Sequence, residues 1–493
     1  MYLTLVILSI LVICCLMKWR NTRSSLYRIA NKFDGPALYP IIGNALLFAG
    51  PRKEILNKII KIHTEYPSSP IRLWFAHRLL LVFTDADQVE KILLSSKLTY
   101  KDAIYDPIKA MVGDGLITGS GVRARLHRKI LSPMLSPKNI NGYIDIFEKH
   151  TEVYIKQLEE KADGQEFDIY WTMSRLCSDI VFDSIMDYKL SKQETEEFLS
   201  NVEFLYDVVI ERLVKIWMQT DALFKLSPIA KRYYKSINVY INFFKKLLKT
   251  KQEELKAGIT SEKANKSPST VEQLLRFAAN DPDAYTDKEI LDEILTLYAA
   301  AQDTTASICS FVLIMLGAYP EAQEKLYQEV NQVHFNRNTA MTTADIAQLT
   351  YTDMVIKEVI RLFPIAPFLV RTCSEDVPID DDITIPANCS VVLGIFDLHH
   401  QSKHWEHPWE FYPEHFLPVT VASRHPSAYL PFSFGKRSCL GKTYALSLIK
   451  VAVARIVQRF KIVADKKVQD LHLHNDISVR STDGYKIKLL LRE

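Results

Sequence analysis

Cysteine is scarce in this chain, and its spacing excludes two kinds of structural site. The seven cysteines stand at positions 14, 15, 177, 309, 373, 389 and 439 of 493 residues, with no C-x-x-C pair and no regular interval. Zinc sites and disulfide frameworks both need recurrent cysteine spacing, so we expect neither, and the pattern fits a reducing compartment. The sequence also has no large excess of basic over acidic residues, or of acidic over basic ones. The 61 basic and 58 acidic residues nearly balance, which leaves no electrostatic footprint for binding nucleic acid.

A linker between domains is missing as well. No Pro/Gly-rich stretch in the middle of the chain separates two plausible cores, although 493 residues exceed the usual size of one domain. We therefore predict one large domain over residues 45–493. Its predicted elements are mostly α-helical, with a small β lobe that contains strands at 71–75 and 79–83, followed by a short helix at 85–94.

The N-terminal segment has a different character. Residues 2–17 are apolar apart from one threonine and one serine, and basic residues follow at positions 18, 20 and 23. We predict that this apolar run is part of a membrane anchor over residues 1–19. The basic residues after it would keep the downstream chain in the cytosol. A cleaved signal peptide is the alternative, but no basic residue precedes the run and no small-residue cleavage site follows it. Residues 20–44, which are basic and then rich in proline and glycine, are predicted to form a stiff hinge.

One ten-residue stretch, Phe432-Ser-Phe-Gly435-Lys-Arg437-Ser-Cys439-Leu-Gly441, organises the rest of the chain. Cys439 comes just before residues whose apolar positions recur at helical spacing, so its sulfur is expected at a helix N-terminus. Such a position favours a thiolate, the form that ligates a metal. We expect Gly435 and Gly441 to permit positive φ and close approach to a flat cofactor, and Arg437 to pair with an acidic group on its rim.

This stretch resembles the haem-binding signature of the cytochrome P450 monooxygenases, Phe-x-x-Gly-x-Arg-x-Cys-x-Gly, at all of its defined positions. The resemblance implies the cytochrome P450 fold. It also implies that Cys439 is the axial ligand of the haem iron and that Phe432, Gly435, Arg437 and Gly441 bind the cofactor. A buried cysteine in a glycine-containing turn is the alternative.

A second signal is a long apolar helix with a carboxylate in its middle. Thr286-Asp-Lys-Glu289 predicts a capping box that begins a helix lasting to Gly317. Asp303 lies in the apolar part, where a carboxylate is costly unless it is paired or useful. A paired core group is one interpretation. The run Ala299-Ala-Ala-Gln-Asp-Thr-Thr also resembles the oxygen-activating helix of the family, which implies that Asp303 is the acid of a proton relay and Thr304 the hydroxyl that passes the proton towards dioxygen.

Two residues of this helix depart from the family pattern. Ala301 replaces the usual glycine, so its methyl group narrows the groove of this helix in which O₂ and water would bind. Ala300 stands where many fatty-acid-hydroxylating relatives have a glutamate that esterifies the haem. Alanine cannot form that ester, so we expect a non-covalent haem b.

A third signal is Glu358-Val-Ile-Arg361, whose i, i+3 spacing places an acid and a base on one helix face. With the prolines that follow and Arg371, it resembles the structural salt-bridge helix of the family. The third partner of that network is normally an arginine, but here it is His415, which can lose its charge near neutral pH. The resemblance also makes Arg371 a partner of a haem propionate.

The remaining propionate contact is predicted in a basic stretch. Five of the seven residues 123–129 can carry positive charge. The corresponding family helix has Trp-x-x-x-Arg, of which this chain keeps Arg128 but has Ala124 in place of the tryptophan. The non-functional interpretation of this basic cluster is a solvated helix face. The functional interpretation is that the cluster also forms a docking surface for an acidic electron donor.

Together these signals are similar to an insect-type microsomal member of cytochrome P450 family 4. The resemblance implies an endoplasmic reticulum enzyme with a cytosolic catalytic domain that inserts one oxygen atom from O₂ into a lipophilic substrate, such as a fatty acid, a terpenoid or a xenobiotic. Electrons would come from NADPH through NADPH–cytochrome P450 reductase, with cytochrome b5 as a second candidate donor. The substrate pocket is expected near residues 105–111, Ala300 and residues 365–369.

Two other functions remain open from the sequence. A haem-thiolate isomerase or dehydratase would need no external electrons, and the acid and hydroxyl at 303 and 304 speak against it. A non-catalytic haem binder or sensor would also tolerate the departures at Ala124, Ala301 and His415. Finally, the turn at Asp483-Gly484 predicts a β-hairpin between residues 477–480 and 485–489.

Overall fold

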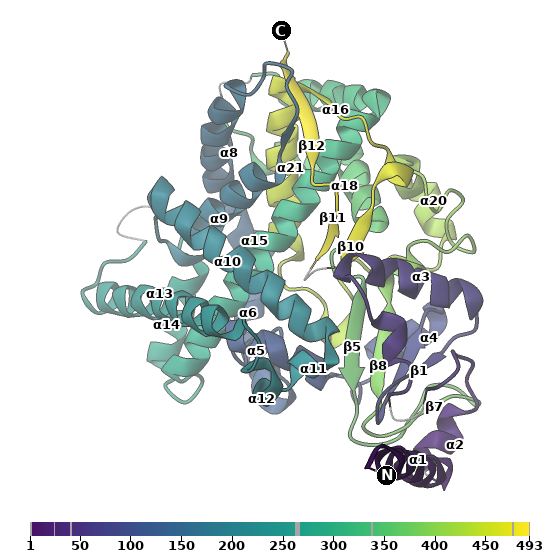
Figure 1. Cartoon of the computed structure of the whole chain (residues 1–493). Helices are drawn as coiled ribbons and strands as arrows, with labels where there is room; N and C mark the ends of the chain where they lie inside the picture. Colours follow the sequence, from purple (N-terminus) through teal and green to yellow (C-terminus); the bar gives the residue numbers. More distant parts are fainter. Residues whose placement is uncertain are drawn as a thin grey trace.

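A single long helix, α15 (Asp287–Ala318), runs through the middle of the computed structural model (Figure 1). The structure describes residues 2–23, 25–39, 42–261, 267–336, 339–475 and 478–492. The predicted capping box is present at the start of α15, where Thr286 Oγ1 accepts the Glu289 N–H and Glu289 accepts the Thr286 N–H. Helices α9 (Tyr170–Met186), α18 (Thr350–Leu362) and α21 (Lys442–Arg459) pack against it. Because they bury nearly its whole surface, the apolar sequence of α15 belongs to the core of the domain.

The other helices surround this centre, and the domain is mostly α-helical as predicted. The longer ones are α3 (Ile55–Glu65), α4 (Ala86–Leu94), α6 (Gly121–Met134), α8 (Ile144–Glu159), α10 (Lys192–Val214), α13 (Ala230–Lys256), α14 (Thr270–Asn280) and α16 (Pro320–Val333). The shorter ones are α2 (Ser25–Ala30), α5 (Asp106–Val112), α7 (Pro137–Asn141), α11 (Ile216–Gln219), α12 (Asp221–Phe224), α17 (Thr343–Gln348), α19 (Ile395–Leu398) and α20 (Pro418–Ser423).

The predicted β lobe is present and contains a five-stranded sheet. Its strands follow the order β1 (Ile71–Phe75), β2 (Arg78–Phe83), β8 (Ser390–Gly394), β5 (Phe368–Thr372) and β3 (Tyr100–Lys101). Only β2 and β8 run parallel; the other neighbours are antiparallel. Leu79, Leu81 and Phe83 join one apolar cluster, while Leu80 and Val82 join another. This alternation follows from the period of two in a strand and shows that both faces of the sheet are covered.

The predicted hairpin near the end of the sequence is wrong. A turn does form there, and the Gly484 N–H donates to the Ser481 carbonyl at 3.4 Å. However, β11 (Val479–Ser481) pairs with β10 (Leu473–Asn475), whereas β12 (Lys486–Leu491) pairs with β9 (Phe460–Val463) and β4 (Phe167–Asp168). The two strands therefore enter different sheets, because long-range partners compete successfully with the local pairing. Ile477, where the predicted hairpin began, lies outside the described residues.

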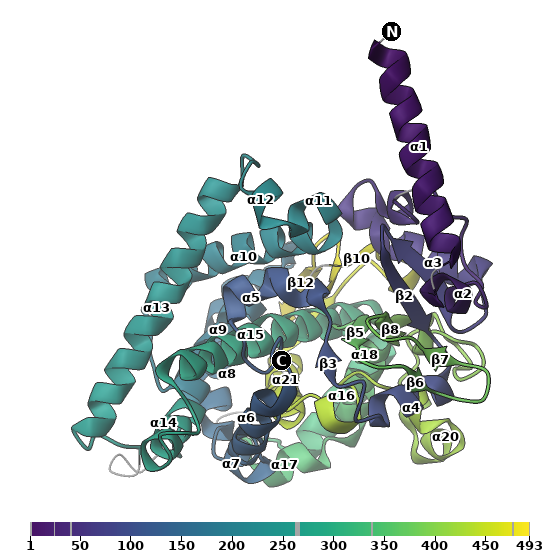
Figure 2. The same cartoon turned by 90° about the horizontal axis from the view of Figure 1, so that it is seen from below.

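Helix α1 (Tyr2–Arg23) projects away from the rest of the chain (Figure 2). Its apolar side chains from Val6 to Leu16 are largely exposed. Among the described residues, α15 is the one helix that is long and apolar enough to cross a membrane, but 83% of its most apolar window is buried. The apolar part of α1, Val6–Met17, is shorter than that criterion requires.

Candidate functional site

Cys439 lies in a tight loop between the 3-10 helix η7 (Gly435–Arg437) and α21. Its N–H donates to the Phe432 carbonyl at 2.8 Å, and this bond closes the loop. The backbone N–H groups of Gly441 and Lys442 donate to its Sγ. The sulfur thus lies at the N-terminus of α21 as predicted, and Cys439 keeps accessible surface although its thiol lies deep among surrounding protein atoms.

The two glycines of this loop differ from each other. Gly435 has a φ of +71°, and an added Cβ would lie 2.5 Å from the Leu93 carbonyl oxygen of α4. Gly441 has a φ of −81°, and its added Cβ would have only Cys439 Sγ nearby, at 3.8 Å. The expected positive φ is therefore correct for Gly435 and wrong for Gly441. The close neighbour of Gly435 is protein backbone, which gives this glycine a packing role.

The pKa of the Cys439 thiol is raised above its usual value. Burial in the protein is the largest cause, and it outweighs the backbone N–H groups of Gly441 and Lys442 and the positive charges of Arg128 and Lys442. A bound metal cation is the additional charge that deprotonates a coordinating thiol.

Four basic side chains cluster beside the cysteine loop. Arg128 comes from α6, Arg371 from β5, Arg437 from η7 and Lys101 from β3. Arg128 donates to the Ser438 carbonyl at 2.5 Å, and Arg437 donates to backbone carbonyls of Thr99 and Gly119 at 3.0 and 2.9 Å. Burial lowers the pKa values of all four side chains. Repulsion by the neighbouring arginines adds to this effect for Lys101 and for Arg437, whose pKa falls to about 10.

The cation cluster fits an anionic ligand. Lys101 and Arg371 are direct cross-strand partners in the β3–β5 pair, and like charges in that arrangement destabilise a sheet. In the part of the chain that the structure describes, Lys101, Arg128, Arg371 and Arg437 form no ion pair with a carboxylate. Two propionate groups of a haem would neutralise this cluster. Lys101 was not predicted, because only its long-range pairing with Arg371 brings it here.

The middle of α15 has an uncovered strip. Ala300 is exposed and Ala301 and Thr304 are partly exposed, within a helix that is otherwise almost fully buried. These positions share one helix face. The Thr304 hydroxyl donates to the Ala300 carbonyl at 2.6 Å. A small apolar strip with one hydroxyl is compatible with one face of a flat cofactor, so these residues also fit a haem.

Asp303 lies about 100° from Thr304 around α15 and, unlike Thr304, is fully buried. Its Oδ1 accepts hydrogen bonds from Arg480 and, at 3.0 Å, from the Tyr170 hydroxyl, and its Oδ2 accepts one from the Ser478 hydroxyl at 2.6 Å. Burial acts against the charge of Arg480, but Asp303, Tyr170 and Glu203 together outweigh it and hold the pKa of Arg480 above its usual value. The carboxylate is therefore a paired core group, one of the two interpretations that the sequence allowed.

Tyr170 connects this buried carboxylate to a second one. Its hydroxyl lies 2.7 Å from Glu203 Oε1 on α10 and 3.0 Å from Asp303 Oδ1. Arg480 also bonds to Glu203, at 3.1 Å. Burial and the nearby Asp303 raise the pKa of Tyr170 well above its usual value, so the hydroxyl stays neutral. Glu203, Tyr170 and Arg480 were not predicted, because their roles depend on contacts between α9, α10 and β11.

Glu358 and Arg361 form the predicted ion pair, and both side chains are completely buried. Two parallel bonds of 2.8 and 2.7 Å join them. Nδ1 of His415 lies 3.2 Å from each Glu358 oxygen, so the third partner is also in place. Burial works to raise the pKa of Glu358, but the bonds from Arg361 and His415 outweigh it and keep the pKa below its usual value.

A fourth residue of this network, Arg424, was not predicted. Its guanidinium lies 3.7 Å from the Trp405 ring centroid and donates to the His415 carbonyl. Burial lowers the pKa of Arg424 to about 10, and the charge of Glu358 acts in the opposite direction. Arg424 thus adds a second cation close to the Glu358–Arg361 pair, in a network where this sequence has His415 in place of the family's arginine.

The basic stretch 123–129 is only partly free for docking. Arg123 binds Glu289 of α15 through two bonds of 2.8 and 2.5 Å, and His127 is buried against Glu293. Arg125 and Lys129 remain exposed. The surface that a partner could use is therefore smaller than the sequence suggested.

This chain matches known proteins along nearly its whole length. The family model Cytochrome P450 matches residues 34–489. Cytochrome P450 4c3 of Drosophila melanogaster is 28% identical over 498 residues, which cover 97% of this chain and 92% of that protein. Cytochrome P450 4V2 of Homo sapiens is 27% identical over 92% of this chain and 88% of its own length. The solved structure of the cytochrome P450DA heme domain superposes with a TM-score of 0.79 at 21% identity, covering 94% of this chain and 98% of that one.

Proposed function

The chain belongs to the cytochrome P450 family, and we propose that it is a membrane-bound haem-thiolate monooxygenase that oxidises a lipophilic substrate with electrons from NADPH. The named relatives are members of family 4. The observation that carries the proposal is the Cys439 thiol at the N-terminus of α21, beside a cluster of cations that has no carboxylate partner in the described structure.

We assign the cofactor-binding roles to residues of this region. Cys439 would ligate the iron of a haem b, and Lys101, Arg128, Arg371 and Arg437 would bind its propionates. Phe432, Gly435 and Gly441 would shape the loop around the ligand. Bound haem supplies the chemistry of O₂ cleavage and oxygen insertion into a C–H bond. Ala300 has no group that could form an ester, so the haem would be released by acidic organic solvent.

The protein's own catalytic contribution would be proton delivery. The Tyr170 hydroxyl has one proton and two carboxylate acceptors within hydrogen-bond distance, Glu203 and Asp303. It can therefore pass a proton inward from Glu203, whose side chain is 15% exposed, to Asp303. Thr304, the next residue, would carry the proton from the buried Asp303 to the uncovered strip of α15. Arg480 holds the Asp303 carboxylate in place during this transfer.

Electrons would arrive from NADPH through a cytochrome P450 reductase, with cytochrome b5 as a second candidate donor. The exposed Arg125 and Lys129 of α6 and Lys436 of the cysteine loop offer positive charge for an acidic partner. We further propose that α1 anchors the protein as a single span in the endoplasmic reticulum membrane, with residues 45–493 in the cytosol as the catalytic domain and residues 20–44 as the hinge. Helix α12 with its exposed Leu223 lies on the same side as α1, which supports this orientation (Figure 2).

The first experiment is the difference spectrum of the dithionite-reduced, carbon monoxide-bound protein in microsomes, with Cys439→Ala in parallel. We expect a strongly red-shifted Soret band that the variant lacks. Haem binding without this shift would refute the thiolate ligand. NADPH-dependent turnover of fatty acids, terpenoids or xenobiotics with reductase would then separate a monooxygenase from an isomerase or dehydratase, which needs no electrons, and from a non-catalytic haem sensor.

A further inference from the structure

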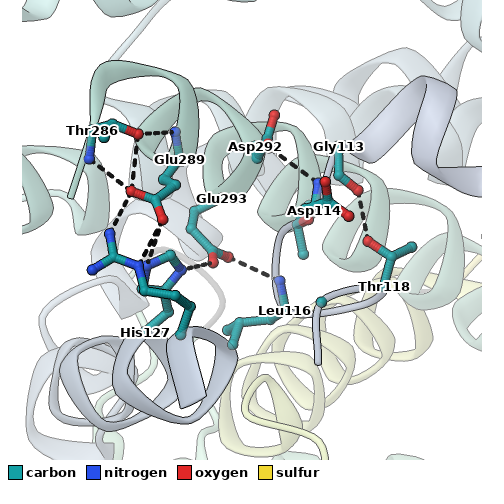
Figure 3. Close-up of polar contacts among 12 residues, drawn as sticks. Gly113, Asp114, Leu116, Thr118, His127, Thr286, Glu289, Asp292 and Glu293 are labelled. Atoms are coloured by element: carbon teal, nitrogen blue, oxygen red, sulfur yellow. Dashed lines mark hydrogen bonds and ion pairs between the residues drawn. The ribbon is translucent and has the colours of Figure 1, made fainter. Parts of the chain in front are cut away.

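The connection between α5 and α6 lies along the N-terminal half of α15, and three side chains of α15 hold it there, of which Figure 3 shows Asp292 and Glu293. The Asp114 N–H donates to Asp292 at 3.0 Å, and the Leu116 N–H donates to Glu293 at 3.1 Å. The Thr296 hydroxyl donates to the Val112 carbonyl at 3.3 Å. These bonds join backbone groups of the connection to side chains of α15, so the segment is fixed to the helix.

The close approach depends on two glycines in this connection. An added Cβ on Gly113 would lie 2.1 Å from Asp292 Oδ1, and one on Gly115 would lie 2.2 Å from Thr296 Oγ1. Neither position has room for a side chain. The Gly-Asp-Gly sequence is therefore explained by the contact with α15.

Glu293 has a second partner on α6. Its Oε1 lies 3.0 Å from His127 Nδ1, and both side chains are buried. The His127 ring stacks on Tyr285 with 4.1 Å between ring centroids, and its Nε2 lies 3.6 Å from Glu289. One buried carboxylate thus binds both the loop, through Leu116, and the helix that follows, through His127. Loss of such a group is costly, because its partners are left unpaired in the interior.

His127 immediately precedes Arg128, the α6 residue that reaches the cysteine loop. Arg128 donates to the carbonyl and the hydroxyl of Ser438, next to Cys439, at 2.5 and 3.1 Å. Neighbouring residues of a helix point about 100° apart. The contact of His127 with α15 therefore sets the rotation of α6 about its axis, and with it the direction of Arg128.

We propose that Glu293 is a positioning residue for the cofactor site. By holding Leu116 and His127 against α15, it keeps Arg128 beside the cysteine loop and so retains the haem. This inference rests on the proposed function, because it needs a bound haem. It assigns a role to a carboxylate that lies outside the cysteine loop and the cation cluster.

The test compares haem release from full-length protein in membranes, measured by transfer to excess apomyoglobin. Glu293→Gln preserves the shape of the side chain and removes the charge that faces His127. We expect release about tenfold faster than from wild type. Asp287→Asn is the matched control, since it removes a carboxylate of the same helix that contacts Gln252 of α13 at 2.8 Å. Release from this variant is expected to remain within about twofold of wild type.

A second variant tests whether the effect passes through Arg128. Arg128→Gln should itself release haem faster, and adding Glu293→Gln should then cause little further change, since the two act in series. Additive effects would overturn the proposal, as would a Glu293→Gln variant that lowers the unfolding temperature but releases haem at the wild-type rate. If Glu293→Gln does not accumulate as folded protein, His127→Leu replaces it, because it removes only the α6 side of the contact.

The carbon monoxide spectrum of the wild type distinguishes failure of the positioning role from failure of the proposed function. A wild type with the Cys439-dependent carbon monoxide band, together with unchanged haem release in Glu293→Gln, refutes the positioning role alone. A wild type without that band refutes the proposed function and this inference together.

Discussion

Asp303 and Thr304 are neighbours in α15, about 100° apart around the helix, and only Thr304 lies on its uncovered strip. The Asp303 carboxylate is fully buried and binds Arg480, Tyr170 and Ser478. The Thr304 hydroxyl lies on the uncovered strip with Ala300 and Ala301. A proton that reaches Asp303 from the protein interior is thus within one residue of the face where the cofactor would bind. This arrangement gives the proposed proton route a direction, from Glu203 through Tyr170 to α15.

The first prediction concerns Tyr170. Tyr170→Phe removes the hydroxyl between Glu203 and Asp303, so turnover should fall by about tenfold or more and show a larger solvent deuterium isotope effect. The carbon monoxide spectrum should stay normal, because the haem contacts are untouched. Tyr206→Phe is the control, since the Tyr206 hydroxyl is buried with no hydrogen-bond partner in the described structure. Equal turnover in the two variants would argue against the route.

The second prediction concerns the Glu358–Arg361 pair. Arg361→Gln leaves the Glu358 charge buried with only part of its partners, so the free energy of unfolding should fall by about 3–5 kcal/mol. Urea unfolding followed by fluorescence measures the change. Lys325→Gln breaks a pair with Glu414 whose lysine side chain is 59% exposed, and it should cost less than about 1 kcal/mol. Similar losses in both variants would contradict the importance of burial.

The third prediction separates the two glycines of the cysteine loop. Gly435→Ala places a Cβ at positive φ and 2.5 Å from the Leu93 carbonyl, so it should destabilise the protein by about 1–3 kcal/mol. Gly441→Ala meets no such contact and should leave the unfolding temperature nearly unchanged. Thermal unfolding of the two variants side by side decides this, and a larger loss in Gly441→Ala would show that the assignment is reversed.

The fourth prediction is a pH dependence at Asp353, which joins α18 to α21. Burial works to raise the pKa of Asp353, but hydrogen bonds from Lys357 and Lys450 outweigh it and lower the pKa. A carboxyl group with a lowered folded-state pKa stabilises the protein above its unfolded pKa, and this contribution is lost as the pH falls through the folded value. Asp353→Asn should therefore cost about 1 kcal/mol at neutral pH.

The difference between wild type and Asp353→Asn should shrink as the pH falls below about 4. Unfolding measured across this range tests the sign. Asp465→Asn provides the control, because Asp465 is mostly exposed in its pair with Lys488, and exposed pairs contribute little. A difference that grows in acid would refute the assignment.

The parts of the fold that local sequence determines could be predicted. The capping box at Thr286 and Glu289 located the start of α15, because both partners lie within one helical turn. The position of Cys439 before α21 and the pairing of Glu358 with Arg361 followed from short-range spacing in the same way. The family resemblance added the third partner, His415, from a distant segment.

The parts that depend on long-range contacts could not be predicted. β12 pairs with β9 and β4 instead of β11, so the Asp483-Gly484 turn misled the hairpin prediction. Lys101 joins the cation cluster only because β3 pairs with β5. Arg424 reaches Trp405 through tertiary packing. In each case the residue that determines the contact is far away in the sequence, so no local sequence pattern predicts it.

The ion pair between Asp303 and Arg480 also has a consequence for how the chain is made. The two residues are 177 positions apart, so a ribosome that adds roughly 5–20 residues per second exposes α15 about 10–35 seconds before it exposes Arg480. During that interval the longest apolar helix of the nascent chain has a carboxylate without its counter-charge and cannot complete its packing. We expect newly made chains to depend on chaperone binding to this region until the last strands emerge.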